Sequence, residues 1–111
     1  MKLADARRIA LSLPEATEEP HFDAASFRVR KKIFATVPPG NETIRVFVAA
    51  ELRDLMVGVD PKTYEKIWWG KKVVGLSVKL ARAKPKDLEL LLRAAWAERA
   101  PARLREQEES E

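Results

Sequence analysis

The spacing of apolar residues changes from a helical period to a strand period and back along this chain, and this constrains its fold most strongly. Apolar side chains recur every three or four positions in residues 3–13, in residues 50–58 and after Pro85. Between these segments they alternate with polar residues, as in half-buried strands. The expected order is helix, three strands, helix, two strands and helix. Such an order favours an α+β two-layer sandwich with a mainly antiparallel sheet.

Alternation also predicts which strand residues face the helices. Strands are expected at residues 26–30, 33–37, 43–48, 73–80 and around the apolar run 67–69. The side chains expected to face inward are Phe27, Val29, Ile44, Val46, Val48, Val74, Leu76, Val78 and Leu80. The other sheet face would be open to solvent or to a partner.

Polar and proline-containing segments predict the connections. Residues 15–20 are interpreted as a polar connector, and Lys31-Lys32 as the turn of the first hairpin. Asp60 and Pro61 fit the N-cap and first residue of a further short helix. A single domain is expected over residues 1–101, followed by a charged, frayed tail at 102–111.

Basic residues are concentrated on the predicted strands and turns. Residues 25–48 hold five basic residues against Glu42 alone, and residues 70–86 hold six and no acidic residue, although the net charge is only +4. Such a patch is typical of a surface that binds polyanions. Alternatively, the cations keep an open sheet soluble and protect its edges. The candidate nucleic-acid-binding residues are Arg28, Arg30, Lys31, Lys32, Arg45, Lys71, Lys72, Lys79 and Arg82.

Two aromatic residues near these cations are candidates for stacking on bases. Phe47 is expected on the outward face of its strand, and Trp69 precedes the turn at 70–72. Trp68 and Trp69 are adjacent, so on a strand they would face opposite sides, with one in the core. The alternative for the other is a ring that covers the sheet end. Trp96, on the apolar stripe of the last helix, is expected in the core.

No residue pattern typical of an enzyme or a metal site occurs. The sequence has no P-loop, dinucleotide fingerprint, nucleophile elbow or paired-histidine helix, and it has no cysteine. The single histidine, His21, lies near Glu18, Glu19 and Asp23, but a structural or exposed role is favoured over a metal site or a general base. We therefore expect a protein that is not an enzyme and has no cofactor and no metal.

The charges near the N-terminus and the short apolar runs set the expected compartment. Asp5, Arg7 and Arg8 interrupt any apolar region of a signal peptide. No apolar run approaches the roughly 20 residues of a membrane span. A cytoplasmic location and no membrane partner are expected.

Several segments across residues 3–100 match a known pattern in combination. They are Leu11-Ser12-Leu13-Pro14-Glu15-Ala16, His21-Phe22, residues 26–37, Asp60-Pro61 and Leu76-Ser77-Val78-Lys79-Leu80 ahead of a Leu-rich helix. Together they resemble the MmcQ/YjbR family. The resemblance implies a small α+β fold like that of type III secretion chaperones and frataxin-like proteins. It also implies a "double wing" DNA-binding role in which the two basic hairpins would be the wings. Relatives often carry a Gly-Trp pair before the late strand, where this chain has Gly75-Leu76.

Three functional hypotheses follow. The first is non-specific binding of nucleic acid, with DNA expected, through the basic strands and hairpin turns. The second is a protein-interaction or chaperone-like module that docks an acidic protein, or a second copy of the chain, on a face that includes Phe47 and, in another register, Phe34. The third is a small-ligand pocket near His21, Tyr64 and Trp69.

Overall fold

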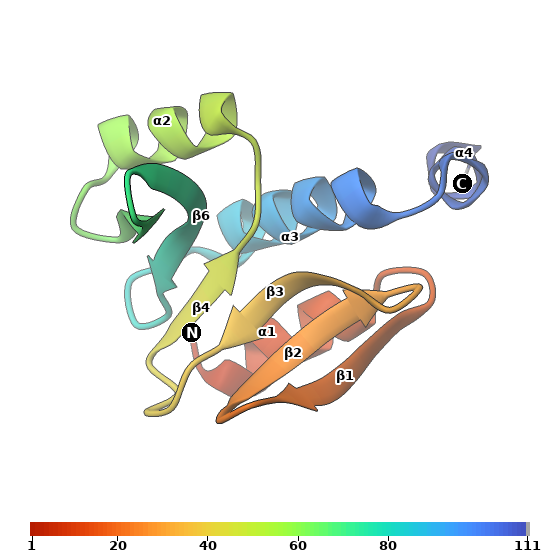
Figure 1. Ribbon diagram of the computed structural model, residues 1–111, viewed down its shortest axis with the longest axis horizontal. Helices are drawn as coiled ribbons and strands as arrows, with labels where there is room; N and C mark the ends of the chain where they lie inside the picture. Colours follow the sequence, from red (N-terminus) through yellow and green to blue (C-terminus); the bar gives the residue numbers. More distant parts are fainter. Residues whose placement is uncertain (111) are drawn as a thin grey trace.

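The computed structural model describes residues 1–110 and has the expected α+β architecture. The elements, in chain order, are α1 (Leu3–Leu11), β1 (Ala16–His21), β2 (Ala24–Val29), β3 (Lys32–Val37), β4 (Thr43–Val46), α2 (Ala50–Val59), β5 (Tyr64–Trp69), β6 (Lys72–Lys79), α3 (Pro85–Arg99) and α4 (Ala102–Ser110). The sheet has the strand order β1-β2-β3-β4-β6-β5, and every pair is antiparallel. α1 and α3 pack behind the sheet, and α2 packs along β5 and β6 (Figure 1).

The core lies between the sheet and the helices, as the alternation of apolar residues predicted. The strand side chains that are buried as expected are Phe27, Val29, Ile44, Val46, Val48, Leu76, Val78 and Leu80. Trp96 of α3 is buried too, and its indole N–H donates to the carbonyl oxygen of Pro14 at 2.9 Å, which ties α3 to the end of α1. No helix among the described residues is long and apolar enough to cross a bilayer.

Residues 15–20, predicted to be a connector, lie largely in the edge strand β1, which pairs with β2. The strand is polar on both faces. On its helix side, Glu18 accepts a hydrogen bond from Nε of Arg7 in α1 at 2.7 Å. On its other side, Glu19 is exposed. An ion pair, instead of an apolar contact, thus joins this strand to α1. The sequence of β1 therefore lacks the alternation of apolar and polar residues that would predict a strand.

Two other segments differ from the expected order. Asp60 and Pro61 do not begin a helix but form a turn into β5, in which the Asp60 carboxylate accepts hydrogen bonds from the Thr63 hydroxyl and the Lys62 amide. The tail expected to be frayed forms α4, whose Leu104 is buried; residue 111 lies outside the described residues. The observed order is therefore helix, four strands, helix, two strands and two helices.

The sheet is joined at its middle by a short ladder. β3 and β4 pair at only two register positions, after which the Phe47 amide donates to the Phe34 carbonyl at 3.2 Å and the chains diverge (Figure 1). Arg99 of α3 bridges this opening. Its Nε donates to the Ile33 carbonyl at 3.1 Å, and its Nη1 donates to the Phe47 carbonyl at 2.8 Å. The Arg99 side chain thus links the chain at β3 to the chain after β4 at the point where the backbone hydrogen bonds between these strands end.

Phe47 lies between this guanidinium and the backbone of β6. The Arg99 Cζ is 5.8 Å from the ring centroid. A Cβ atom on Gly75 would lie 3.0 Å from Phe47 Cδ1 and 3.1 Å from the carbonyl oxygen of Val46. Only a glycine lets the ring approach β6 this closely.

Gly75→Ala is expected to destabilise the fold by about 1–2 kcal/mol, because the added methyl group overlaps the Phe47 ring and the β4 backbone. Gly58→Ala is the matched control. A Cβ at Gly58 meets nothing within 4 Å, so alanine should stabilise α2 by roughly 0.5 kcal/mol. Urea unfolding of both variants measures the two effects; a neutral Gly75→Ala would show that the contact relaxes freely.

Arg99→Gln is expected to lower the free energy of unfolding by about 2 kcal/mol, because two carbonyls lose charge-assisted hydrogen bonds. Arg8→Gln, in α1, removes an exposed ion pair with Asp5 and should cost less than about 0.5 kcal/mol. Equal losses in the two variants would mean that the Arg99 bridge adds nothing beyond a surface pair.

Candidate nucleic-acid interface

A row of side chains crosses the sheet face opposite the helices. Thr36 of β3 is in register with Arg45 of β4, and Arg45 with Ser77 of β6. Lys79 lies on the same face because it is two residues from Ser77. The side chains of Arg45 and Lys79 are exposed, and neither forms a hydrogen bond or an ion pair within the part of the chain that the structure describes. These two cations form the free basic part of the open face.

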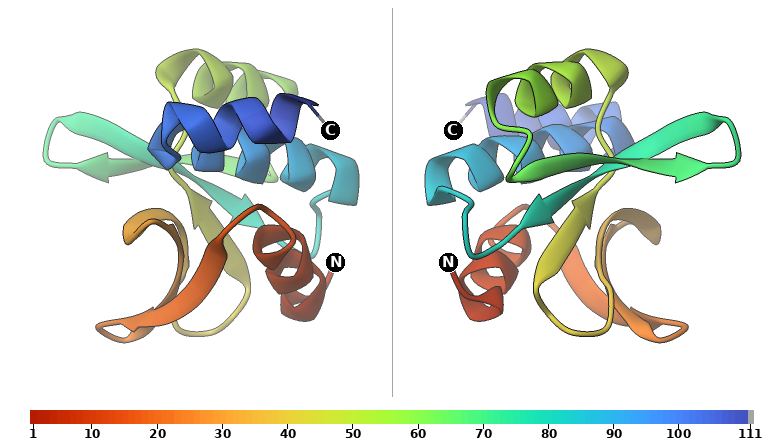
Figure 2. Two further views of the ribbon diagram at one scale, coloured as in Figure 1. Left: turned by 90° about the vertical axis from the view of Figure 1, so that its right-hand side faces the viewer. Right: turned by 90° about the vertical axis from the view of Figure 1, so that its left-hand side faces the viewer.

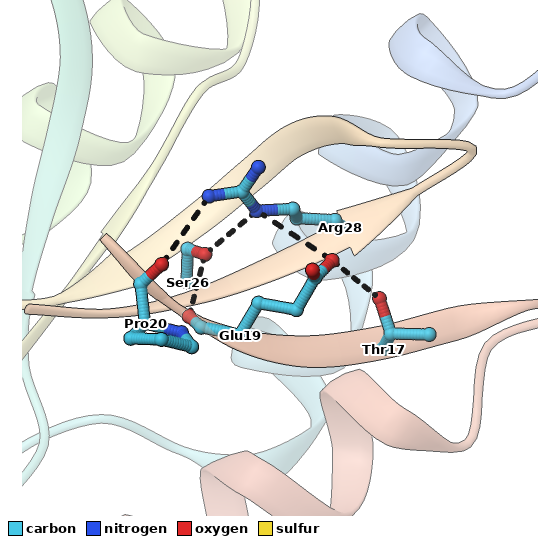
Figure 3. A network of polar contacts seen from close by, with 5 residues as sticks. All are labelled: Thr17, Glu19, Pro20, Ser26 and Arg28. Atoms are coloured by element: carbon cyan, nitrogen blue, oxygen red, sulfur yellow. Dashed lines mark hydrogen bonds and ion pairs between the residues drawn. The ribbon is translucent and has the colours of Figure 1, made fainter.

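Arg28 was also expected on this face. Its guanidinium instead forms hydrogen bonds that stabilise the β1–β2 hairpin. Figure 3 shows its Nε donating to the Ser26 hydroxyl at 2.9 Å and its Nη2 to the Pro20 carbonyl at 3.4 Å. The Glu19 carboxylate lies 3.8 Å away. The Ser26 hydroxyl donates in turn to the Glu19 carbonyl at 2.7 Å. Arg28 is therefore a structural residue whose charge is largely balanced.

The β2–β3 turn consists of Arg30 and Lys31, one residue earlier than predicted. Both have positive φ, at 49° and 68°, as a type I′ turn requires. Arg30 pairs with Glu15 through two hydrogen bonds, at 2.6 and 3.0 Å. This pairing lowers the pKa of Glu15 and raises the pKa of Arg30. Lys31 and its neighbour Lys32 remain free of side-chain partners among the described residues.

The β5–β6 turn carries the second pair of free lysines. Gly70 has φ of 62° and supplies the positive φ that this tight turn needs. Lys71 and Lys72 follow it, exposed and without side-chain partners among the side chains that the structure describes, those of residues 1–107. Figure 2 shows that this hairpin and the β1–β2 hairpin project to the same side, away from α1 and the start of α3.

Arg82, the last candidate cation, follows β6 and contacts the turn that precedes β5. Its Nε donates to the Thr63 hydroxyl oxygen at 3.2 Å, and its guanidinium lies 3.9 Å from the Asp60 carboxylate. The hydrogen bond from Thr63 lowers the pKa of Asp60, with smaller contributions from the Lys62 amide and from Arg82. Arg82 thus supports a turn, and its charge faces a carboxylate.

The aromatic candidates differ from one another. Phe47 is half-buried between Arg99 and Gly75, so much of its ring surface already contacts other residues of the protein. Phe34 is completely buried. Trp69 is 79% exposed as predicted, but Trp68 is 61% exposed as well, so the expectation of one core tryptophan is wrong.

The register of β5 explains the exposure of both indoles. It shifts between Ile67 and Trp68, where Ile67 faces Gly75 and Trp68 faces Val73. Val74 is left over at this bulge and is 39% exposed, although it was predicted to face inward. Beyond the bulge the hairpin extends past the helices, so neither of its faces is covered (Figure 2).

One exposed aromatic residue was missed. Phe22 occupies the β1–β2 turn with φ of 56° and is 94% exposed, with its ring 4.7 Å from that of His21. His21 therefore lies at the opposite edge of the sheet from Tyr64 and Trp69, and the three do not form a common pocket. No group of three or more His, Cys, Asp or Glu residues that could hold a metal ion occurs among the described residues.

The sequence matches the YjbR family model over residues 11–98. The chain belongs to the YjbR family. The match includes both basic hairpins, β2–β3 and β5–β6, and confirms the resemblance inferred from short segments. It ends before α4, which lies outside the matched region.

The fold of this YjbR-family domain is similar to that in a crystal structure of protein DR2400 from Deinococcus radiodurans, which contains a DUF419 domain. The TM-score is 0.72 at 17% sequence identity, and the superposition covers 85% of this chain and 75% of the other. At this identity the likeness shows a shared fold. The comparison with curated proteins gave no match.

Asp60→Asn should reveal the contribution of the Asp60 turn to stability through its pH dependence. Because folding lowers the pKa of Asp60, its charge stabilises the fold above its unfolded pKa, and this is lost as pH falls through the folded pKa. The wild type should be more stable than the variant near neutral pH, and the difference should shrink as pH falls below the unfolded pKa of about 4. Asp23→Asn, in the exposed β1–β2 turn, is the control. A pH-independent difference in urea midpoint would contradict this.

Proposed function

We propose that this YjbR-family domain is a cytoplasmic, non-catalytic protein that binds nucleic acid without sequence specificity through the free cations of its sheet. The observation that carries the proposal is a division among the basic residues. Arg28, Arg30 and Arg82 are paired with carboxylates. Of the candidate cations, those left without side-chain partners among the described residues are Lys31, Lys32, Arg45, Lys71, Lys72 and Lys79. They lie on the open face and at two hairpin turns.

Backbone strain at the β2–β3 turn supports a use for the charge of Lys31 beyond folding. A type I′ turn favours Asn-Gly, because both central residues need positive φ. This chain has Arg30 and Lys31 there, at a cost of about 1 kcal/mol for each residue. Such local strain is typical of positions where the side chain has a function.

The arrangement suits phosphate groups better than base edges. Lysine and arginine on strands and turns contact phosphate oxygens, which are the same at every nucleotide. If all six free cations meet phosphates, log K should fall against log salt with a slope of about −5 on duplex DNA and about −4 on a single strand. DNA is the partner we expect, and RNA offers the same phosphates.

The test replaces the two free cations of the open face. Arg45→Gln/Lys79→Gln should weaken binding to a labelled mixed-sequence duplex and reduce the magnitude of the salt slope by about 2, because two phosphate contacts are lost. Fluorescence anisotropy at low and at physiological salt measures both quantities. Thermal unfolding should be nearly unchanged, because both side chains are exposed and unpaired within the described residues.

Lys84→Gln/Lys86→Gln is the matched control, because it removes the same charge at the start of α3, on the opposite side from the projecting β5–β6 hairpin (Figure 2). This control should leave the slope unchanged. If both double variants weaken binding equally, the net charge of the protein, and not the position of these cations, determines binding. If the wild type does not bind at low salt, the proposal is rejected.

A protein-interaction module is the second candidate, favoured by exposed apolar residues on α2. Leu55 is 58% exposed and Val59 is 72% exposed, and they lie on the helix that packs along β5. An acidic protein or a second copy of the chain could use this surface. Sedimentation velocity discriminates the candidates, since a concentration-dependent dimer lost in Leu55→Lys would support the second.

A further inference from the structure

The tip of the β5–β6 hairpin is an exposed aromatic surface that the fold does not use. Trp68 and Trp69 are 61% and 79% exposed. Their indole N–H groups donate no hydrogen bond, and their rings contact no other aromatic ring, within the described residues. Trp96, by contrast, is buried with its N–H bonded to Pro14. Two exposed indoles on consecutive residues, one on each face of the hairpin, are uncommon on a surface that meets only water.

The charges around the two rings indicate what would cover them. Residues 66–75 contain three lysines and no carboxylate. Lys66 is held by Asp54 at 2.7 Å, whereas Lys71 and Lys72 are free among the described residues. The surface therefore fits a partner with flat apolar groups on a negatively charged chain. Unpaired bases on a phosphate backbone have this chemistry.

Other occupants fit the tip less well. A second copy of the hairpin would bring Lys71 and Lys72 of both copies together, and like charges repel. An anionic membrane could take up the indoles and the lysines. It would leave Arg45 and Lys79 unused, because they lie back on the sheet face rather than at the tip. A flexible nucleic-acid strand can contact both.

A single strand can use the tryptophans in a way that a duplex cannot. In a duplex the base faces are stacked on one another and hidden, so cations reach phosphates but indoles do not reach bases. In a single strand the bases can swing out and stack on an aromatic ring. The two tryptophans should therefore add affinity for single strands alone.

We propose that the β5–β6 hairpin is a stacking platform for single-stranded nucleic acid, in which Trp68 and Trp69 hold unpaired bases while Lys71 and Lys72 contact the adjoining phosphates. This inference rests on the proposed function and names the form of nucleic acid that the interface takes. The two tryptophans and the two lysines lie at the same end of one hairpin. The bases that stack and the phosphates that are contacted therefore belong to neighbouring nucleotides.

The experiment compares a labelled oligothymidine with a mixed-sequence duplex of equal length, by anisotropy at low salt. Trp68→Ala/Trp69→Ala should lose roughly 10-fold or more in affinity for oligothymidine, given the usual effect of removing a stacking residue. Its affinity for the duplex should stay within about twofold, because the lysines remain. Trp68→Phe/Trp69→Phe should restore most of the lost affinity, since phenylalanine also stacks. Phe22→Ala, which removes an exposed ring from the other projecting hairpin, is the control and should bind like the wild type.

The possible outcomes separate the two proposals. A wild type that binds neither oligonucleotide rejects the proposed function. A wild type that binds both, with a double alanine variant that binds both unchanged or loses both equally, rejects the stacking platform alone. Tryptophan-dependent binding to vesicles of phosphatidylserine and phosphatidylcholine, without single-strand selectivity, would also overturn it in favour of a membrane. The unfolding temperature of each variant, expected to match the wild type because both indoles are exposed, excludes misfolding as the cause.

Discussion

The bridge from Arg99 to the carbonyls of Ile33 and Phe47 is the interaction on which the shape of the sheet depends. The ladder between β3 and β4 is short, so strands β1 to β3 and strands β4, β6 and β5 would otherwise meet along only a few backbone hydrogen bonds. Because the guanidinium comes from α3, the helix layer fixes how the two parts of the sheet join. The same contact covers part of Phe47, which leaves that ring only half-exposed on the surface where stacking was expected.

Folding also divides the basic residues into two groups. Arg28 closes the β1–β2 hairpin, Arg30 pairs with Glu15, and Arg82 supports the turn before β5. Each of these cations contributes through a nearby carboxylate or carbonyl. The other candidate cations lie in water, where an unpaired lysine costs little, so nothing in the fold requires them to be neutralised. The set of candidate cations that stays free is therefore smaller than the set that the sequence suggested, and it lies at Arg45, Lys79 and the lysines of two hairpin turns.

Alternation predicted the strands well wherever one face meets the helices, because an inward apolar residue such as Ile44 or Leu76 leaves a period of two. It failed for β1, where the pairing of Glu18 with Arg7 replaces an apolar contact. It also failed at Trp68, since a bulge in the pairing with β6 is a property of two strands together. The Asp60-Pro61 pair has the chemistry of a helix start, and the same chemistry serves a turn when Thr63 and Arg82 complete it.

The family, the α+β class and the concentration of charge on the hairpins followed from the order of the residues, because each is a pattern along the linear sequence. Which cations stay free, which aromatic rings are exposed and how far the β5–β6 hairpin projects were decided only by the tertiary structure. These properties depend on partners that are distant in the sequence: Glu15 lies 15 residues from Arg30, and Arg99 lies 52 residues from Phe47. A pairing between such residues has no local signature, since it exists only once the strands and helices have packed.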